Sequence, residues 1–216
     1  HSGKDDWSSP GKVYAAELPQ DLRIYNEINP FPLKVIAEGL TKNHGFCSME
    51  REGVVSALIC AKSGVFSYYP PATPDGAWRI EQLLDTPASD AVLVDFDGDG
   101  QDELLTIEPF HGDCVRIYKK SNDGFVPVYA YEPAEFSHAI FGGTLLGGPA
   151  ALVGHRKGAR DLVLFQYDSA QSAYKSIVLD HDVGPANVYC YQNDGKDIVI
   201  STNREVDEVA MYILTQ

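Results

Sequence analysis

The feature that most constrains the fold is a short apolar run ending in an aromatic residue, which occurs five times along the chain. The five runs are Leu22–Tyr25, Val65–Tyr68, Val115–Tyr118, Leu162–Phe165 and Val209–Tyr212. Their aromatic residues lie 43, 50, 47 and 47 positions apart. Such regular spacing predicts a fold built from repeated supersecondary units rather than from one irregular core.

Other β-rich runs accompany these five. One precedes each of them, at Val13–Ala16, Ala57–Cys60, Leu104–Ile107, Ala151–Val153 and Ile198–Ile200, and another follows four of them, at Leu33–Ala37, Trp78–Leu84, Val126–Tyr131 and Tyr174–Leu179. Gly, Pro, Asn and Asp separate the runs, and no helical period is visible, which indicates an all-β protein. A period near 47 residues is the size of one four-stranded β-propeller blade.

We therefore predict an all-β propeller with five blades of four antiparallel strands and imperfect terminal blades. The expected blades are about 12–40, 41–86, 87–134, 135–183 and 184–216, so residues 12–216 form one domain after a flexible segment, 1–11. The first blade lacks an obvious first strand and the last blade stops after its third, so either the ring closes imperfectly or upstream sequence is missing. An open β-sandwich is the alternative fold.

An acidic loop between two of these runs has the spacing of a cation site. Its sequence, Asp95-Phe-Asp-Gly-Asp-Gly-Gln-Asp-Glu103, alternates carboxylates with small residues. Asp95, Asp97 and Asp99 can point at one centre, while the Gln101 carbonyl and the Glu103 carboxylate complete an all-oxygen shell. Oxygen donors in a flexible loop suit Ca²⁺. The alternative is an acidic hairpin that binds no metal.

This DxDGDGxDE loop resembles the FG-GAP/VCBS repeat of β-propellers. The resemblance covers about a dozen residues, and it implies a propeller fold with a structural Ca²⁺ at Asp95, Asp97, Asp99, Gln101 and Glu103.

Two columns of polar residues repeat at the blade period. The first opens the innermost strands, at His44, Asp90, His138 and Asn187, and the second closes the following strands, at Glu17, Lys62, Glu108, His155 and Thr202. Because neighbouring strands run antiparallel, both columns are expected on one face, at the mouth of the central channel. The next loops add His111, Arg156, Lys157, Arg160 and Arg204 to that face. Concave sites with convergent polar groups are typical ligand sites.

The chemistry of this face suggests a metal. Two neutral imidazoles and a carboxylate can hold Zn²⁺ or a transition metal with open positions. Candidate catalytic residues are His155, Glu108 and Lys62, which can move a proton beside such a metal. Alternatively, Asp90 and Asn187 are ordinary turn formers, and Lys62 pairs with Glu108.

Blades that begin with His also resemble, loosely, the propeller of aldos-2-ulose dehydratase-like sugar lyases, and this resemblance rests on His44 and His138. It implies a metal-assisted sugar lyase or isomerase. We predict a propeller that binds a small, carbohydrate-like molecule at the channel mouth. The alternative is a non-catalytic FG-GAP-type module that binds another protein or has a structural role.

Charge and composition limit the partners. A net charge of −14 and a pI near 4.7 argue against nucleic acid and against anionic lipid, because phosphate binding requires a basic surface. No apolar run approaches the roughly 18 residues that a membrane span requires. The four cysteines form no CxxC motif, and buried thiols are expected. The chain begins with His1, so a signal peptide that has been removed and a cytoplasmic origin are both open alternatives.

Overall fold

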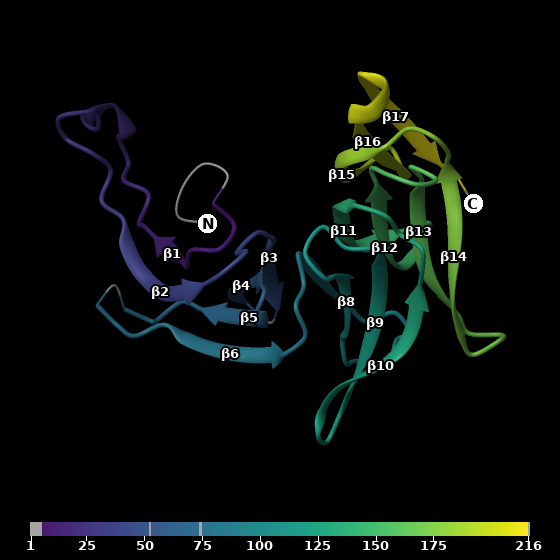
Figure 1. Ribbon diagram of the computed structural model, residues 1–216, viewed down its shortest axis with the longest axis horizontal. Coiled ribbons are helices and arrows are strands. Elements are labelled where there is room, and N and C mark those ends of the chain that lie inside the picture. Colours follow the sequence, from purple (N-terminus) through teal and green to yellow (C-terminus); the bar gives the residue numbers. More distant parts are fainter. Residues whose placement is uncertain (1–5, 52, 74, 216) are drawn as a thin grey trace.

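The all-β prediction is confirmed: the chain forms five antiparallel sheets with only two short 3₁₀ helices among the described residues (Figure 1). The computed structural model describes residues 6–51, 53–73 and 75–215. The predicted flexible segment 1–11 therefore lies partly outside the described residues. No helix of this part of the chain is long and apolar enough to cross a membrane.

The sheets follow one another along the chain. The first pairs β1 (Gly11–Ala15) with β2 (Lys34–Leu40). The second contains β3 (Phe46–Arg51), β4 (Val54–Ala61), β5 (Gly64–Tyr69) and β6 (Arg79–Leu84). The third contains β7 (Asp90–Val94), β8 (Glu103–Glu108), β9 (Cys114–Ser121) and β10 (Gly124–Tyr131).

The fourth sheet contains β11 (Ser137–Leu145), β12 (Gly148–His155), β13 (Leu162–Asp168) and β14 (Ala173–Asp180). The last contains β15 (Pro185–Asn193), β16 (Lys196–Asn203) and β17 (Glu208–Leu214), with the 3₁₀ helix η2 (Arg204–Val206) before β17. In sheets two to five the strands lie side by side in chain order. Their first strands contact one another, β7 against β3, β11 against β7 and β15 against β11, so these strands lie on the inside of the arrangement.

The predicted closed ring is not what the structure shows. The sheets are consecutive and laid face to face, but they do not close into a propeller, and the two-stranded and three-stranded sheets lie at opposite ends of the view in Figure 1. In the described part of the chain, no ladder of hydrogen bonds joins these two terminal sheets.

The first sheet also differs from the prediction. The run Leu22–Tyr25, expected to be a strand, forms the 3₁₀ helix η1 (Leu22–Ile24). The Asp21 side chain caps η1: it accepts hydrogen bonds from the Arg23 amide and guanidinium, at 3.0 and 2.9 Å. A carboxylate that binds nearby amides in this way stabilises a turn in competition with a strand. The first sheet consequently keeps two strands.

The core lies between successive sheets, where apolar side chains of one sheet pack on those of the next. Val92 and Ile117 meet Val153 and Phe165 between sheets three and four, and all four are almost fully buried. Similar clusters fill the other junctions. Burying each side chain of this size contributes about 1.5–3 kcal/mol. The sheets approach closely: a Cβ on Gly142 of β11 would lie 2.8 Å from Cβ of Val92 on β7. This packing fixes the inner strands, and with them the loops at their ends.

The four cysteines are unpaired. Cys60 and Cys114 are buried, whereas Cys47 and Cys190 are half-buried. Burial raises the pKa of each of these thiols. They are therefore neutral at physiological pH, which fits a packing role for them.

Candidate functional site

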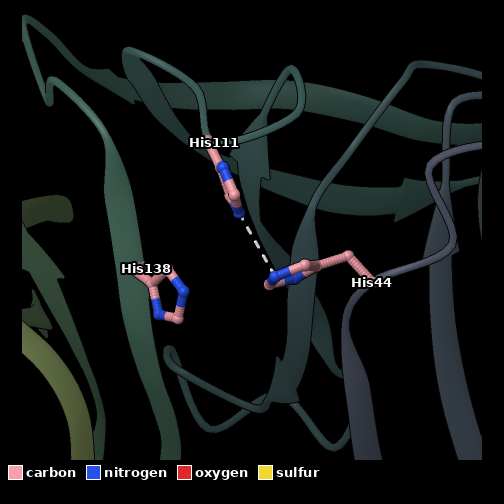
Figure 2. Close-up of side chains that lie close together, drawn as sticks. All are labelled: His44, His111 and His138. Atoms are coloured by element: carbon pink, nitrogen blue, oxygen red, sulfur yellow. Dashed lines mark hydrogen bonds between the residues drawn. The ribbon is translucent and has the colours of Figure 1, made fainter. Parts of the chain in front are cut away.

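Three histidines from three different sheets converge at one end of the inner strands (Figure 2). His44 lies in the loop that leads into β3, His111 in the turn between β8 and β9, and His138 at the start of β11. The beginning of a first strand and the end of a second strand lie at the same end of an antiparallel sheet. Residues separated by dozens of positions along the chain therefore share one face.

The distances within this trio suit a metal ion. Nε2 of His44 and Nε2 of His111 lie 3.2 Å apart, and nitrogen atoms of all three rings lie within 4.8 Å of one another. Two nitrogens bound at about 2.05 Å to a tetrahedral Zn²⁺ lie about 3.3 Å apart, so the first pair already has the required separation. The ring of His138 lies 5.5 Å from that of His44 and 5.4 Å from that of His111, between centroids. Figure 2 shows the three rings facing a common centre.

Hydrogen bonds orient the rings for coordination. Nδ1 of His138 lies 2.8 Å from the carbonyl oxygen of Ala186 and donates to it, because a carbonyl can only accept. In the neutral ring this leaves the lone pair on Nε2, which is how metal-binding histidines are commonly held. Within the described residues, Nδ1 of His44 is buried without a hydrogen-bond partner.

The surroundings keep two of the rings neutral. Burial, and then the neighbouring His138, lower the pKa of His44. Burial lowers the pKa of His111 to about 4, with further contributions from His44, His138, Arg156 and Lys42. A metal binds the unprotonated imidazole, so both rings are in the binding form at physiological pH.

Aromatic side chains wall the trio. Phe110 stacks on His111, with centroids 4.2 Å apart, and meets the edge of His44 at 5.5 Å. Phe136 lies 4.7 Å from His111 on another side, and Trp7 packs against Phe110 at 5.0 Å. These rings restrict solvent, which strengthens electrostatic interactions at the site.

The other two members of the first polar column have local roles. Asp90 accepts a hydrogen bond from the Ala91 amide at 3.1 Å, and burial raises the pKa of its carboxyl to about 7. It packs against Gly45, the residue after His44, since a Cβ there would lie 2.6 Å from its Oδ1. Asn187 lies in β15, is exposed and accepts from the Val188 amide at 2.9 Å.

The residues of the second polar column do not share one location. Glu17 lines a hollow of about 1040 Å³ with Tyr25 and Trp78, between the first two sheets, and no signal in the sequence indicated this hollow. Lys62 is exposed in the turn between β4 and β5. Thr202 donates to the Asn187 carbonyl at 3.4 Å. Neither Glu17, Lys62 nor Thr202 belongs to the histidine trio.

Glu108 is buried in a network of its own. It accepts hydrogen bonds from the hydroxyls of Thr106 and Tyr118, both at 2.7 Å, and pairs with Arg116 at 3.1 Å. The expected partner Lys62 is therefore replaced by Arg116. All three partners lie on β8 and β9, in the same sheet as Glu108.

His155 is buried near a small cavity. Ser137 donates to the Ala134 carbonyl at 2.7 Å, so its oxygen can accept from Nδ1 of His155 at 3.4 Å. The opposite nitrogen, Nε2, is buried and has no partner among the described residues. It belongs to a cavity of about 40 Å³ that Asp161 also lines, which has room for one water molecule.

His111 was not predicted as a metal ligand from the sequence. The residue was expected on this face but not in the metal set, because it lies in a turn and outside both periodic columns. Its backbone has φ of +48°, which His adopts only uncommonly. The signal that could have identified it is the run Phe110-His111-Gly112 directly after a strand.

The acidic loop lies at the opposite end of β7 from Asp90, as its place between β7 and β8 requires. Oxygen atoms of Asp95, Asp97 and Asp99 lie within 4.8 Å of one another. The loop is folded around these carboxylates: Gly100 donates to Asp95 at 3.0 Å, and Gln101 donates to Asp99 at 2.8 Å. Nζ of Lys119 lies among them, in contact with Asp97 and 2.9 Å from Asp99.

Glu103, at the C-terminal end of the loop, also belongs to this cluster of carboxylates. It is fully buried and accepts from the Phe96 amide at 2.7 Å, while Nζ of Lys119 lies 3.5 Å from its Oε1. The hydrogen bond from Lys119 lowers the pKa of Asp99, and the carboxylates of Asp97 and Asp99 raise that of Lys119. The lysine thus occupies the position that a bound cation would take.

Neither protein-family models nor curated proteins contain a match to this chain.

Proposed function

We propose that the chain binds a small molecule through a metal ion held by His44, His111 and His138. The observation that supports this most strongly is the approach of three imidazoles from three sheets to within 4.8 Å, nitrogen to nitrogen. Three neutral nitrogen ligands leave coordination positions open, as in sites where a metal binds substrate or water. Zn²⁺ fits these ligands well, and Co²⁺ is its spectroscopic substitute.

Metal titration tests this proposal. We expect the purified protein, stripped with EDTA, to bind one equivalent of Co²⁺ or Zn²⁺ by calorimetry. His44→Ala, His111→Ala and His138→Ala should each lose this binding and remain folded. His181→Ala is the matched control, because His181 is exposed and pairs with Asp161 instead. Equal binding by the parent and by the three variants would refute the site.

The carbohydrate-like ligand and the metal-assisted lyase or isomerase activity belong to the same proposal. They are supported by the loose resemblance of the blades to sugar lyases and by His155, whose unpartnered Nε2 suits a general base. Release of an unsaturated sugar product by Zn²⁺-loaded protein, lost in His155→Gln, would support catalysis. Binding without turnover would limit the function to recognition.

We also propose that the acidic loop takes a structural Ca²⁺, as the FG-GAP/VCBS-like blade pattern suggests. Asp95, Asp97, Asp99, the Gln101 carbonyl and Glu103 would hold it, and the ion would fasten the turn between β7 and β8. The donor set fits, since it contains only oxygen, and Oδ1 of Asp95 is buried without a hydrogen-bond partner among the described residues. Lys119 has to leave the loop when Ca²⁺ enters.

An interaction module within an incomplete propeller is the second candidate function. Its support is an apolar stripe on the last strand, β17, where Val209, Met211 and Ile213 alternate and are 72%, 62% and 51% exposed. Exposed apolar surface of this kind is common at protein interfaces. Sedimentation of the parent and of Met211→Asp tests it: a self-associating parent and a monomeric variant are expected.

A further inference from the structure

Cations surround the histidine trio on two sides. Nζ of Lys42 lies 5.2 Å from the centroid of Phe110, and Nζ of Lys157 lies 5.2 Å from that of Phe136. These two phenylalanines are the walls in contact with His111. Both ammonium groups therefore lie just outside the ring of aromatic side chains that encloses the candidate metal.

Neither ammonium is neutralised by a carboxylate. Within the described residues, Lys42 and Lys157 form no ion pair, whereas the nearby Arg156 is paired with Glu205 at 2.7 Å. Free cations are unusual here, because the whole chain carries a net charge of −14. With a divalent ion on three neutral imidazoles, the site would hold several positive charges and no balancing anion from its own ligands.

We propose that the ligand of this site is a small organic carboxylate, which binds the metal through its oxygens and is attracted by Lys42 and Lys157. The inference rests on the proposed metal site and defines the chemical class of its ligand. A carboxylate supplies the missing negative charge and an oxygen for the open coordination position. Phe110 and Phe136 favour a carboxylate over the more strongly hydrated inorganic phosphate.

The test uses the visible spectrum of the Co²⁺-loaded protein. Oxalate should shift the spectrum saturably, inorganic phosphate should do so only at higher concentration, and neutral glucose should not. Lys42→Gln and Lys157→Gln should bind Co²⁺ like the parent but bind oxalate about threefold to tenfold more weakly, as expected for the loss of one charge several ångströms away. Lys196→Gln, the same change at the first residue of β16 and at the far end of the strands, should leave oxalate binding unchanged.

Each outcome has a defined meaning. If Co²⁺ binds but oxalate leaves the spectrum unchanged, or if both lysine variants bind oxalate like the parent, the carboxylate inference is wrong and the metal site stands. Tighter binding of phosphate than of oxalate would replace the carboxylate by a phosphate ligand. If Co²⁺ itself does not bind, the metal site and the inference both fail.

Discussion

Replacing Lys119 by Met should lower the stability of the protein in the absence of Ca²⁺ and raise the affinity of the acidic loop for Ca²⁺. In EDTA, the variant loses the ammonium that faces Asp97, Asp99 and the fully buried Glu103. Leaving a buried carboxylate such as Glu103 without its charged partner costs about 1–3 kcal/mol. At about 2–4 °C per kcal/mol for a chain of this size, the melting temperature should fall by several degrees.

For Ca²⁺ binding, in contrast, the same substitution should be favourable. The ammonium lies 2.9 Å from Oδ2 of Asp99, so it competes with the ion for the same oxygens. Lys119 has to give up these contacts when the ion enters, and even an ammonium displaced to about 4 Å from a divalent ion costs about 2 kcal/mol at the dielectric constant of water. Lys119→Met should therefore bind Ca²⁺ about thirtyfold more tightly than the parent.

Calorimetric titration with Ca²⁺ and thermal melts in EDTA and in millimolar Ca²⁺ measure both effects. Lys120→Met is the matched control, since Lys120 is the exposed next residue of β9 and faces the other side of the strand. If Ca²⁺ shifts the melting temperature of neither protein, then Lys119 is the permanent cation of the loop and the acidic residues only form a turn.

Three further predictions concern the scaffold. Burial raises the pKa of Asp90 to about 7 in the folded protein, above its unfolded value of about 4. The contribution of this group to stability should therefore be greatest below pH 4 and should fall as the pH rises to 7. Asp90→Asn should remove that pH dependence in urea titrations from pH 4 to 8. Gly142→Ala should lower the free energy of unfolding by about 1–3 kcal/mol, because the added Cβ would clash with Val92. Gly148→Ala should lower it by less than half as much, because a Cβ there would have no atom within 4 Å. Glu108→Ala should destabilise the fold by about 1–3 kcal/mol in the same assay, because it leaves the buried hydroxyl of Tyr118 without its acceptor, and it should leave metal binding intact.

The strand pattern could be read from the sequence because it is local. Four of the five apolar runs that end in an aromatic residue lie in strands β5, β9, β13 and β17. The first run failed because the carboxylate of Asp21 competes for the Arg23 amide, an interaction that apolar periodicity does not register. Ring closure failed as a prediction for a different reason: it depends on the angles between sheets, and a repeat length does not define those angles.

The candidate site was predicted in part. Periodicity placed His44 and His138 at the same end of the inner strands, and they lie 5.5 Å apart between ring centroids. Period alone does not say which way a side chain points, so Glu108 occupied a column position yet faces Arg116 inside its own sheet. His111 was outside the set because a turn residue follows no strand period, and only the packed structure places its ring against His44.

X-ray absorption spectroscopy of the Zn²⁺-loaded protein tests the metal site most directly. The geometry predicts a first shell with three imidazole nitrogens at about 2.0 Å, together with at least one exchangeable oxygen ligand. His111→Ala should lose this imidazole shell, because the variant is expected not to retain the metal. A shell made only of oxygen, or one unchanged by that substitution, would show that His44, His111 and His138 do not hold a metal.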